Sequence, residues 1–202
     1  MAIASWKVRA GLPAVVALAW AALTVRGDDG GTNSPPVIAS ITAVQVAGQK
    51  FRISGTVTDE APGGCTVILS GAANQFVTCD ASGHFDGIFD VPTPGPATAV
   101  AGDGVQSSQP VNLNLTNAAP ATTCQAGARG STLVVNGQVT DEVPAGLVVT
   151  LSGTRAVNGK TAIVLADGSW SVTVTVFSGS HGNVTAKVTD WYGLTGQATT
   201  SY

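Results

Sequence analysis

Two acidic turns are the stretches of this 202-residue chain whose residue types could do chemistry. In each half of the chain an Asp-Glu pair follows an alternating apolar run, and a further Asp comes later, after another such run. The six carboxylates are Asp59, Glu60, Asp103, Asp141, Glu142 and Asp190. Carboxylate oxygens are hard ligands, and Ca²⁺ takes six to eight oxygen ligands in proteins. A calcium site in each half is therefore one hypothesis.

The alternative is that these acids serve their own turns. Asp59 and Asp141 can accept hydrogen bonds from the backbone two residues on, and Glu60 and Glu142 can point into water. The D-x-D-x-D-G spacing of a strong calcium loop is absent from both stretches. The sequence leaves both interpretations open.

The acidic turns belong to a longer stretch that the chain contains twice. Residues Gly55–Gly71 and Gly137–Gly153 share the pattern G-x-V-T-D-E-x-P-x-G-x-x-V-x-L-S-G. Asp, Pro and Gly between two alternating apolar runs predict a turn between two strands. Because the rest of each half repeats around this stretch, we expect two copies of one small β domain.

Composition and turn spacing predict short strands throughout both halves. Only 10% of the residues are charged, and glycine, threonine, valine, alanine and serine dominate. The expected strands in the first half are Val37–Val46, Lys50–Thr58, Cys65–Ser70, Gln75–Cys79, His84–Asp90, Ala97–Ala101 and Gln109–Leu115. Those in the second are Thr122–Ala126, Thr132–Thr140, Leu147–Ser152, Lys160–Leu165, Ser169–Phe177, Asn183–Thr189 and Leu194–Ser201. Seven strands in each half predict an all-β chain of two tandem sandwiches, with essentially no helix after the N-terminal segment.

Alternation also predicts which side chains form the core. Trp170, Val172, Val174 and Val176 share one face of their strand, and Ser and Thr alternate with them on the other. Phe85 takes the place of Trp170 in the first half, after a comparable glycine turn. We expect both aromatic side chains to be buried rather than to form a platform for a ligand.

The N-terminus has the features of an export signal. Lys7 and Arg9 precede an apolar run from Leu12 to Val25, and small residues around Arg26 offer a cleavage site. The alternative is an uncleaved N-terminal anchor, and both place residue 28 onward outside the cytoplasm. We expect a signal helix at 1–27, a flexible spacer at 28–36, domains at 37–116 and 122–202, and a linker at 117–121 that limits bending. After residue 27, six basic residues face twelve acidic ones, which argues against nucleic-acid binding.

The repeated pattern, together with Asp167–Val174 and the runs Val184–Asp190 and Gly193–Thr195, resembles the bacterial Ig-like repeats of secreted and surface proteins. The resemblance covers about 165 residues and implies Ig-like sandwiches that act as spacers, stalks or adhesive modules. In an Ig-like sandwich the second and sixth strands run the same way. The three carboxylates of each domain should then share one pole, and in the second domain Asn117 and linker carbonyls could add ligands.

The cysteines and histidines suggest no catalytic centre. Cys65 and Cys79 lie opposite each other across a predicted hairpin, so a disulfide is feasible, and the alternative is two small buried hydrophobic side chains. Cys124 is expected to be a buried free thiol. His84 and His181 stand in glycine-bounded turns, and Ser180 is the immediate neighbour of His181, which disfavours nucleophile–base geometry.

The sequence therefore predicts a non-catalytic protein that is secreted, periplasmic or at the cell surface. The first hypothesis is a structural or adhesive module, whose partner would be a protein or polysaccharide at the cell surface. The second is a ligand-binding module stiffened by Ca²⁺, with carbohydrate as one candidate ligand. No other cofactor is expected, and membrane contact would come only through an uncleaved N-terminal segment.

Overall fold

The computed structural model describes residues 32–202. The predicted signal peptide and residues 28–31 of the predicted spacer lie outside the described residues. Within the described part, Asn33–Tyr202 forms one compact unit, which contains two β-sandwiches with a core each. No helix in this part is long and apolar enough to cross a membrane.

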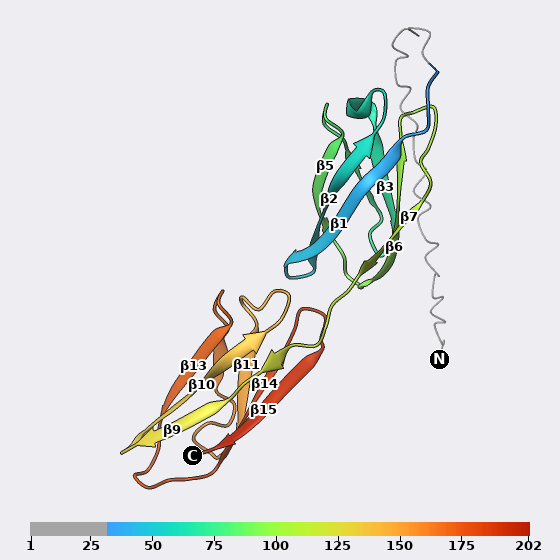
Figure 1. Cartoon of the computed structure of the whole chain (residues 1–202). Coiled ribbons are helices and arrows are strands. Elements are labelled where there is room, and N and C mark those ends of the chain that lie inside the picture. The colour runs from blue at the N-terminus through green and yellow to red at the C-terminus, as the bar shows by residue number, and fades with distance from the viewer. Residues whose placement is uncertain (1–31) are drawn as a thin grey trace, which may run out of the picture. The chain divides into compact units, whose positions relative to one another are not determined.

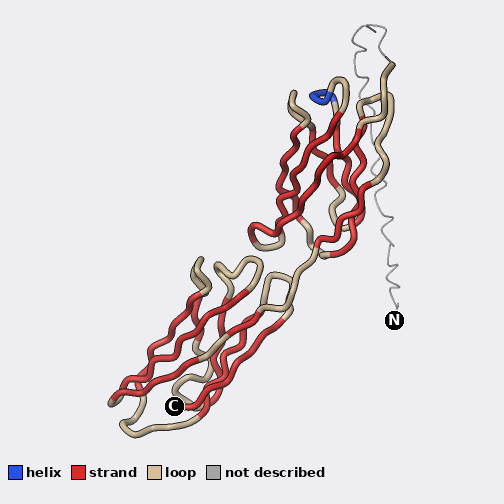
Figure 2. Tube along the Cα trace, viewed as in Figure 1, coloured by secondary structure: helices blue, strands red, loops and turns tan. Residues whose placement is uncertain are grey.

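The first sandwich has the seven expected strands. They are β1 (Val37–Ala47), β2 (Lys50–Thr58), β3 (Thr66–Gly71), β4 (Gln75–Thr78), β5 (His84–Asp90), β6 (Gly95–Gly102) and β7 (Val111–Leu115). One sheet has the order β1-β2-β5 and the other β4-β3-β6-β7, all antiparallel (Figures 1 and 2). The fourth strand pairs with the third rather than the fifth, unlike the order of constant-type immunoglobulin domains. The only helical element among residues 32–202 is the three-residue 3₁₀ turn η1 (Pro62–Gly64) in the first acidic turn, so the expectation of essentially no helix is confirmed for these residues.

The second sandwich repeats this order with one difference. Its strands are β8 (Ala121–Thr122), β9 (Gln125–Arg129), β10 (Thr132–Thr140), β11 (Val148–Gly153), β12 (Thr161–Ile163), β13 (Ser169–Thr175), β14 (Asn183–Thr189) and β15 (Thr195–Ser201). The sheet β12-β11-β14-β15 faces β13 and β10, with β8 and β9 both paired to β10. The single first strand predicted at Thr122–Ala126 is therefore wrong, because the strand is interrupted at Thr123 and Cys124.

A glycine in the second strand of each sandwich explains how the first strand passes over the core aromatic residue. A Cβ on Gly55 would lie 2.1 Å from the Ser40 carbonyl oxygen and 2.6 Å from the Phe85 ring. A Cβ on Gly137 would lie 2.0 Å from the Thr123 carbonyl oxygen and 2.8 Å from the ring of the core tryptophan. Only glycine leaves room for both neighbours. These close contacts coincide with the irregular part of β1 and with the break between β8 and β9.

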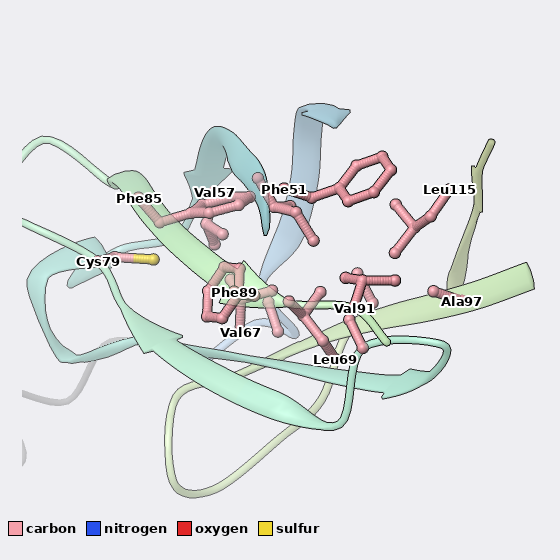
Figure 3. Close-up of a cluster of buried hydrophobic side chains, with 14 of the residues drawn as sticks. Phe51, Val57, Val67, Leu69, Cys79, Phe85, Phe89, Val91, Ala97 and Leu115 are labelled. Carbon is pink, nitrogen blue, oxygen red and sulfur yellow. The ribbon is translucent and has the colours of Figure 1, made fainter. Parts of the chain in front are cut away.

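The two cores confirm the predicted inward faces. Phe85 is paired with Gly55 and is 1% exposed, and Trp170 is paired with Gly137 and is 3% exposed. Figure 3 shows the first core, where Phe85, Val67 and Leu69 converge from both sheets. Full burial of each such side chain contributes about 1.5–3 kcal/mol. The cores therefore account for the packing of the sheets and leave the turns to supply any site.

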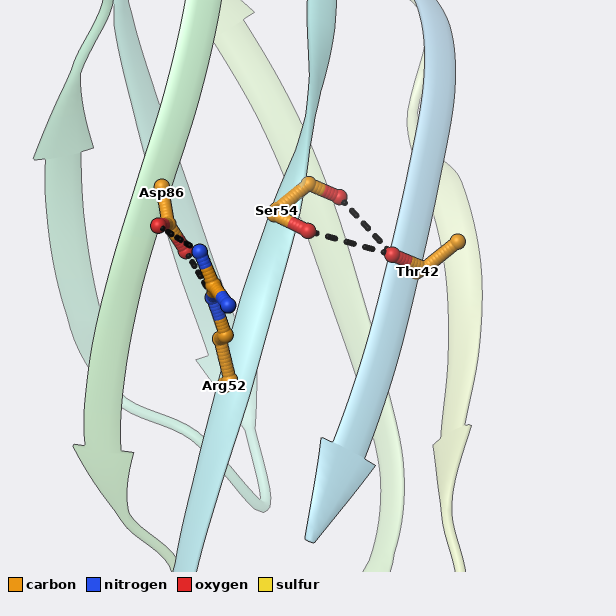
Figure 4. Close-up of polar contacts among 4 residues, drawn as sticks. All are labelled: Thr42, Arg52, Ser54 and Asp86. Carbon is orange, nitrogen blue, oxygen red and sulfur yellow. Dashed lines mark hydrogen bonds and ion pairs between the residues drawn. The ribbon is translucent and has the colours of Figure 1, made fainter. Parts of the chain in front are cut away.

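The outer face of the β1-β2-β5 sheet is polar, and its side chains form hydrogen bonds and ion pairs with one another. Arg52 on β2 makes a two-pronged ion pair with Asp86 on β5, with N–O distances of 2.8 and 2.5 Å (Figure 4). The Thr42 hydroxyl lies 3.2 Å from the Ser54 hydroxyl and donates to its carbonyl at 3.3 Å. The Arg52 pair lowers the pKa of Asp86 and raises that of Arg52. Because these groups are exposed, their pairing contributes little stability.

Candidate functional site

The acidic turns are built as hydrogen-bonded turns, as one of the two interpretations predicted. Asp59 Oδ1 accepts from the Ala61 N–H at 2.8 Å, and Asp141 Oδ1 accepts from the Val143 N–H at 2.9 Å. Each bond runs from a carboxylate to the backbone two residues on, which is the Asx turn typical of aspartate. These two aspartates therefore shape the turns that follow β2 and β10.

Asp190 organises the turn between β14 and β15. Its Oδ1 atom accepts from the backbone N–H groups of Tyr192 and Leu194, at 2.9 and 2.7 Å. The residue is 7% exposed, the lowest exposure of any charged residue in residues 32–202. Charge-assisted bonds of this kind are stronger than neutral ones. The sequence identified Asp190 but assigned it to a cation rather than to its own turn.

The linker that enters the second sandwich is held by the same acidic residues. The Asn117 amide Nδ2 donates to Asp190 Oδ2 at 2.7 Å. The next backbone N–H, that of Ala118, donates to Glu142 Oε1 at 3.0 Å. Glu142 therefore binds the chain instead of only pointing into water. We call this pair of bonds the entry clasp of the second sandwich.

The first sandwich has an equivalent entry clasp. The Asn33 amide Nδ2 donates to Asp103 Oδ2 at 3.0 Å, and the Ser34 N–H donates to Glu60 Oε1 at 3.0 Å. Gln106 adds a bond from its Nε2 to the Asn33 carbonyl at 2.7 Å. The part of the predicted flexible spacer from Asn33 onward is thus fastened to the first sandwich. In each domain, two of the three carboxylates predicted to share a pole bind the entering chain, and the third bonds within its own turn.

Sequence reasoning missed Asn33 and gave Asn117 only a possible role toward a metal. The signal that could have identified them is their shared position. Asn33 stands three residues before Pro36, and Asn117 stands three residues before Pro120, at the entrance to each domain. Because the two domains are repeats, the shared spacing indicates that both use an asparagine in the same way at their entrance.

The hydrogen bonds set the charge state of these carboxylates. Ser34 holds the pKa of Glu60 below its usual value. Burial acts to raise the pKa of Asp103, but bonds from the Gln106 and Val105 N–H groups and from Asn33 bring it below its usual value. Asp141 behaves in the opposite way: burial raises its pKa, its bond from Val143 opposes this, and the nearby acids raise it further. Burial without a nearby opposite charge therefore disfavours the ionised form of Asp141.

A cation could be held only with help from groups other than carboxylates. Among residues 32–202, no group of three or more His, Cys, Asp or Glu side chains is arranged to hold a metal ion. Four buried side-chain oxygens of the described residues nevertheless lack a hydrogen-bond donor, and three of them belong to the acidic turns and the linker: Asp59 Oδ2, Asp141 Oδ2 and Asn117 Oδ1. Two of them lie at the entry to the second sandwich, where amide and backbone oxygens could complete a ligand set. The calcium hypothesis stays a prediction.

The turn that carries Asp190 also carries the aromatic residues that contact the first sandwich. The Tyr192 hydroxyl donates to the Val91 carbonyl at 2.8 Å, and its ring packs against the first core. Gln49 Nε2 donates to the Trp191 carbonyl at 3.1 Å. The Trp191 indole N–H in turn donates to the Val143 carbonyl at 3.1 Å, within the second acidic turn. Asp190 therefore fixes both the linker and the residues that meet the neighbouring sandwich.

The cysteines are free thiols in the structure. Cys65 and Cys79 are buried at the end of the β3–β4 pairing, where the Cys79 N–H donates to the Cys65 carbonyl at 2.9 Å. Burial raises the pKa of Cys65 to about 12 and also raises that of Cys79. The opposite placement that the sequence predicted is confirmed, and the disulfide itself stays a prediction. Cys124 packs against the second core, as expected for a thiol without a reactive role.

The two histidines lie apart. His84 begins β5 in the first sandwich, and His181 lies in the loop between β13 and β14 of the second. His181 lines a groove of about 650 Å³ together with Ser180, Phe177 and Tyr202. Ser180 and His181 make no side-chain hydrogen bond to each other within the described residues, so no nucleophile–base pair is formed there.

No protein-family model matches the chain, and no curated protein matches its sequence. Similar solved structures include the adhesin InvE of Yersinia pseudotuberculosis, with 16% identity over 87% of this chain and 61% of that one, at a TM-score of 0.35. A bacterial ice-binding adhesin of 1.5 MDa matches with 20% identity over 83% of this chain and 64% of that one, at a TM-score of 0.36. The D0-D1 domains of intimin match with 15% identity over 84% of this chain and 98% of that one, at a TM-score of 0.28. At these TM-scores the assignment of Ig-like sandwiches depends on the strand order and register described above.

Proposed function

We propose that this chain is a non-catalytic structural or adhesive module that works outside the cytoplasm. The observation that carries the proposal is the repeated entry clasp, in which Asn33 binds Asp103 and Asn117 binds Asp190. A clasp that fixes the entering chain to each sandwich restrains the linker, which suits a protein whose domains must keep a defined position relative to one another. Four of the six acids that could have formed a site bind the entering chain instead: Glu60, Asp103, Glu142 and Asp190.

The surfaces of the sandwiches agree with this role. Charged side chains on the outer face of the β1-β2-β5 sheet pair with one another, as in the Arg52–Asp86 and Lys50–Asp90 ion pairs. The grooves of the second sandwich are lined by turns and strand edges, and in the groove lined by Ser180 and His181 these two side chains form no hydrogen bond with each other. The predicted export signal would deliver such a module to the cell exterior.

The proposal is tested by locating the chain and asking what it adheres to. We expect antibodies against the two sandwiches to label intact cells that express the chain, and protease added outside to remove the label. A matched variant with Lys7→Glu and Arg9→Glu, which reverses the charge before the apolar run, should lose the label and accumulate inside. Deleting the gene should reduce attachment of the cells to a surface or to one another. Retention of the unaltered chain in the cytoplasm would refute the proposal.

The second candidate function is a ligand-binding module stiffened by Ca²⁺. It is favoured by the unpartnered oxygens Asp141 Oδ2 and Asn117 Oδ1, which lie at the entry to the second sandwich. A bound cation would neutralise Asp141, whose raised pKa reflects burial without a compensating charge. We expect Ca²⁺ to raise the melting temperature relative to chelator, and Asp141→Asn to abolish that difference. Identical melting curves with Ca²⁺ and with chelator would exclude this candidate.

A further inference from the structure

The charges of the second sandwich are separated between its two poles. All four of its acidic residues, Asp141, Glu142, Asp167 and Asp190, lie in the turns at the pole where the chain enters. The loops at the opposite pole carry Arg129, Arg155, Lys160 and His181 and no acidic residue. We call this second group of loops the basic pole. Figure 1 shows the ends of β9 and β13 and the C-terminus together at this end of the sandwich.

The basic pole is joined by hydrogen bonds and is open to solvent. The Val176 N–H donates to the Ser131 carbonyl at 2.8 Å, which joins the end of β13 to the β9–β10 turn. The Tyr202 hydroxyl lies 3.0 Å from the Thr154 hydroxyl, which joins the C-terminal strand to the β11–β12 loop. A groove of about 650 Å³ lies between these loops, and Arg155 and His181 line it. None of Arg129, Arg155 and Lys160 forms a salt bridge with a described residue.

Phe177 makes this pole unusual for a surface. It lines the same groove and is 90% exposed, the highest exposure of any large apolar side chain in residues 32–202. An exposed aromatic side chain amid unpaired arginines is typical of the centre of an interface. The pole is therefore shaped to receive a partner that is acidic and carries an apolar tip.

The first sandwich presents a surface of that description. Its turns Asp59–Gly64, Asp80–Gly83 and Asp103–Gln106 share one pole, because Glu60 and Asp103 both bind the entering chain and Gly63 lies against Ala81. We call these turns the acidic pole. They carry Asp59, Glu60, Asp80 and Asp103 and no lysine or arginine. At the tip of the last turn Val105 is 82% exposed.

The contact between the two sandwiches of one chain supplies a precedent for joining these poles. There the turn of Asp190 meets Gln49 and Val91 of the first sandwich. The equivalent residues at the basic pole are Ser131 and Val176, because the Val91 N–H donates to the Gln49 carbonyl at 2.9 Å in the same way. The turn of Asp103 is the counterpart of the turn of Asp190, since each accepts from the asparagine of its entry clasp. Each half of the internal contact thus has a counterpart that contacts no other sandwich within the described residues, although the turn of Asp103 binds the entering chain at Asn33.

From these observations we infer that the basic pole binds the acidic pole of a second copy of this chain. The four carboxylates of the acidic pole, which have no lysine or arginine among them, would face Arg129, Arg155 and Lys160, which have no acidic residue among them. Val105 would approach the groove at Phe177. This interface joins two different surfaces, so it is heterologous and extends into chains of molecules instead of closing a dimer. This inference goes beyond the proposed function, because a spacer or adhesin can act as a single copy.

The test is sedimentation of the full-length chain over a range of protein and salt concentrations. We expect the average mass to rise with protein concentration at about 20 mM salt and association to weaken at least about 10-fold by about 300 mM salt. Arg155→Glu with Phe177→Ser should reduce association at least about 10-fold. Lys187→Glu makes an equal charge change at an exposed position in the middle of β14, away from both poles, and should leave association unchanged. Melting temperatures close to that of the unaltered chain show that each variant folds.

A mixing experiment separates this interface from a symmetric one. Glu60→Lys with Val105→Lys removes the acidic pole, and Arg155→Glu with Phe177→Ser removes the basic pole. Each variant alone should be monomeric, and an equal mixture should form dimers and nothing larger, because only one intact pair of poles remains. A mixture that stays monomeric would overturn the inference. So would an unaltered chain that remains monomeric at low salt while its basic pole binds an anionic polysaccharide such as heparin.

Discussion

The side-chain amide of Asn117 donates to the carboxylate of Asp190 across 2.7 Å, and this bond joins the linker that enters the second sandwich to the turn after β14. Asp190 has already ordered its own turn through Oδ1, so its second oxygen is free to hold the linker. The same arrangement of Asn33 and Asp103 in the first sandwich shows that the bond belongs to the domain plan.

Asn117→Ala should destabilise the second sandwich. It leaves Asp190 Oδ2 buried without its donor, and an unsatisfied buried acceptor costs about 1–3 kcal/mol. Urea unfolding followed by tryptophan fluorescence would measure the loss. Asn33→Ala is the matched control: it removes an equivalent bond, but Asp103 is more exposed than Asp190, so we expect a smaller effect. Equal effects of the two substitutions would contradict a role for burial.

Gly137→Ala should damage the second sandwich more than any exposed substitution. The new Cβ would lie 2.0 Å from the Thr123 carbonyl oxygen and 2.8 Å from the Trp170 ring, so backbone and core must both move. Overpacking of this kind costs about 1–3 kcal/mol or more. Gly127→Ala on the adjacent strand β9 is the control, since its Cβ would meet no atom within 4 Å. If the two variants unfold at the same temperature, this close approach is unimportant for stability.

The sandwich could be predicted from the sequence because its signals are local. Alternation gave the bounds of β2, β5, β10 and β14 to the residue, and the aromatic position after the glycine turn gave Phe85 and Trp170 as core residues. The break at Thr123 could not be predicted, because it follows from a carbonyl that packs over Gly137 from another strand. The entry clasps were also missed. They depend on Asn33 meeting a residue 70 positions away, which no local pattern reports.

The sequence identified the carboxylates of the candidate site but not their role in binding the entering chain. The sequence predicted that the three acids of each domain share one pole, and in the structure two of the three bind the entering chain in each domain. It could not tell that the donors would be Asn117 and the Ala118 N–H instead of a cation, because backbone N–H groups leave no trace in residue type. Only the unpartnered oxygens keep the calcium hypothesis testable.

Cys65 and Cys79 should resist alkylation in the folded chain. Burial raises the pKa of Cys65 to about 12, so its thiolate is scarce at neutral pH, and the side chain is shielded from reagent. Counting labelled thiols by mass spectrometry after denaturation tests the predicted disulfide. Protein purified without reductant should then label only at Cys124, and reduced protein should label at all three cysteines. Three labels in both samples would exclude the disulfide.

Tyr192→Phe should weaken the contact between the two sandwiches without altering either core. The substitution removes only the hydroxyl that donates to the Val91 carbonyl, and such a bond contributes about 0.5–1.5 kcal/mol. Limited proteolysis at the linker should become faster, because the linker opens more often. Tyr202→Phe removes a hydroxyl contact within the second sandwich and should not change cleavage at the linker. Unchanged cleavage in Tyr192→Phe would show that this contact does not restrain the linker.

The charges of Asp103 and Asp141 should have opposite effects on the free energy of unfolding. This free energy would be measured as a function of pH in the presence of chelator. The folded-state pKa of Asp103 is lowered, so its stabilising contribution is present above its unfolded pKa and is lost as pH falls through the folded value. The folded-state pKa of Asp141 is raised, so its favourable contribution exists below its unfolded pKa and is lost as pH rises through the folded value.

At pH 7, Asp103→Asn should therefore lower the free energy of unfolding. Asp141→Asn keeps an acceptor for the Val143 N–H and removes the poorly compensated charge, so it should raise that free energy. Both differences should shrink as pH falls through the folded-state pKa values of the two carboxylates, because the protonated forms carry no charge. If Asp141→Asn destabilises the chain at pH 7 without any divalent cation, burial is not what sets the charge of this turn.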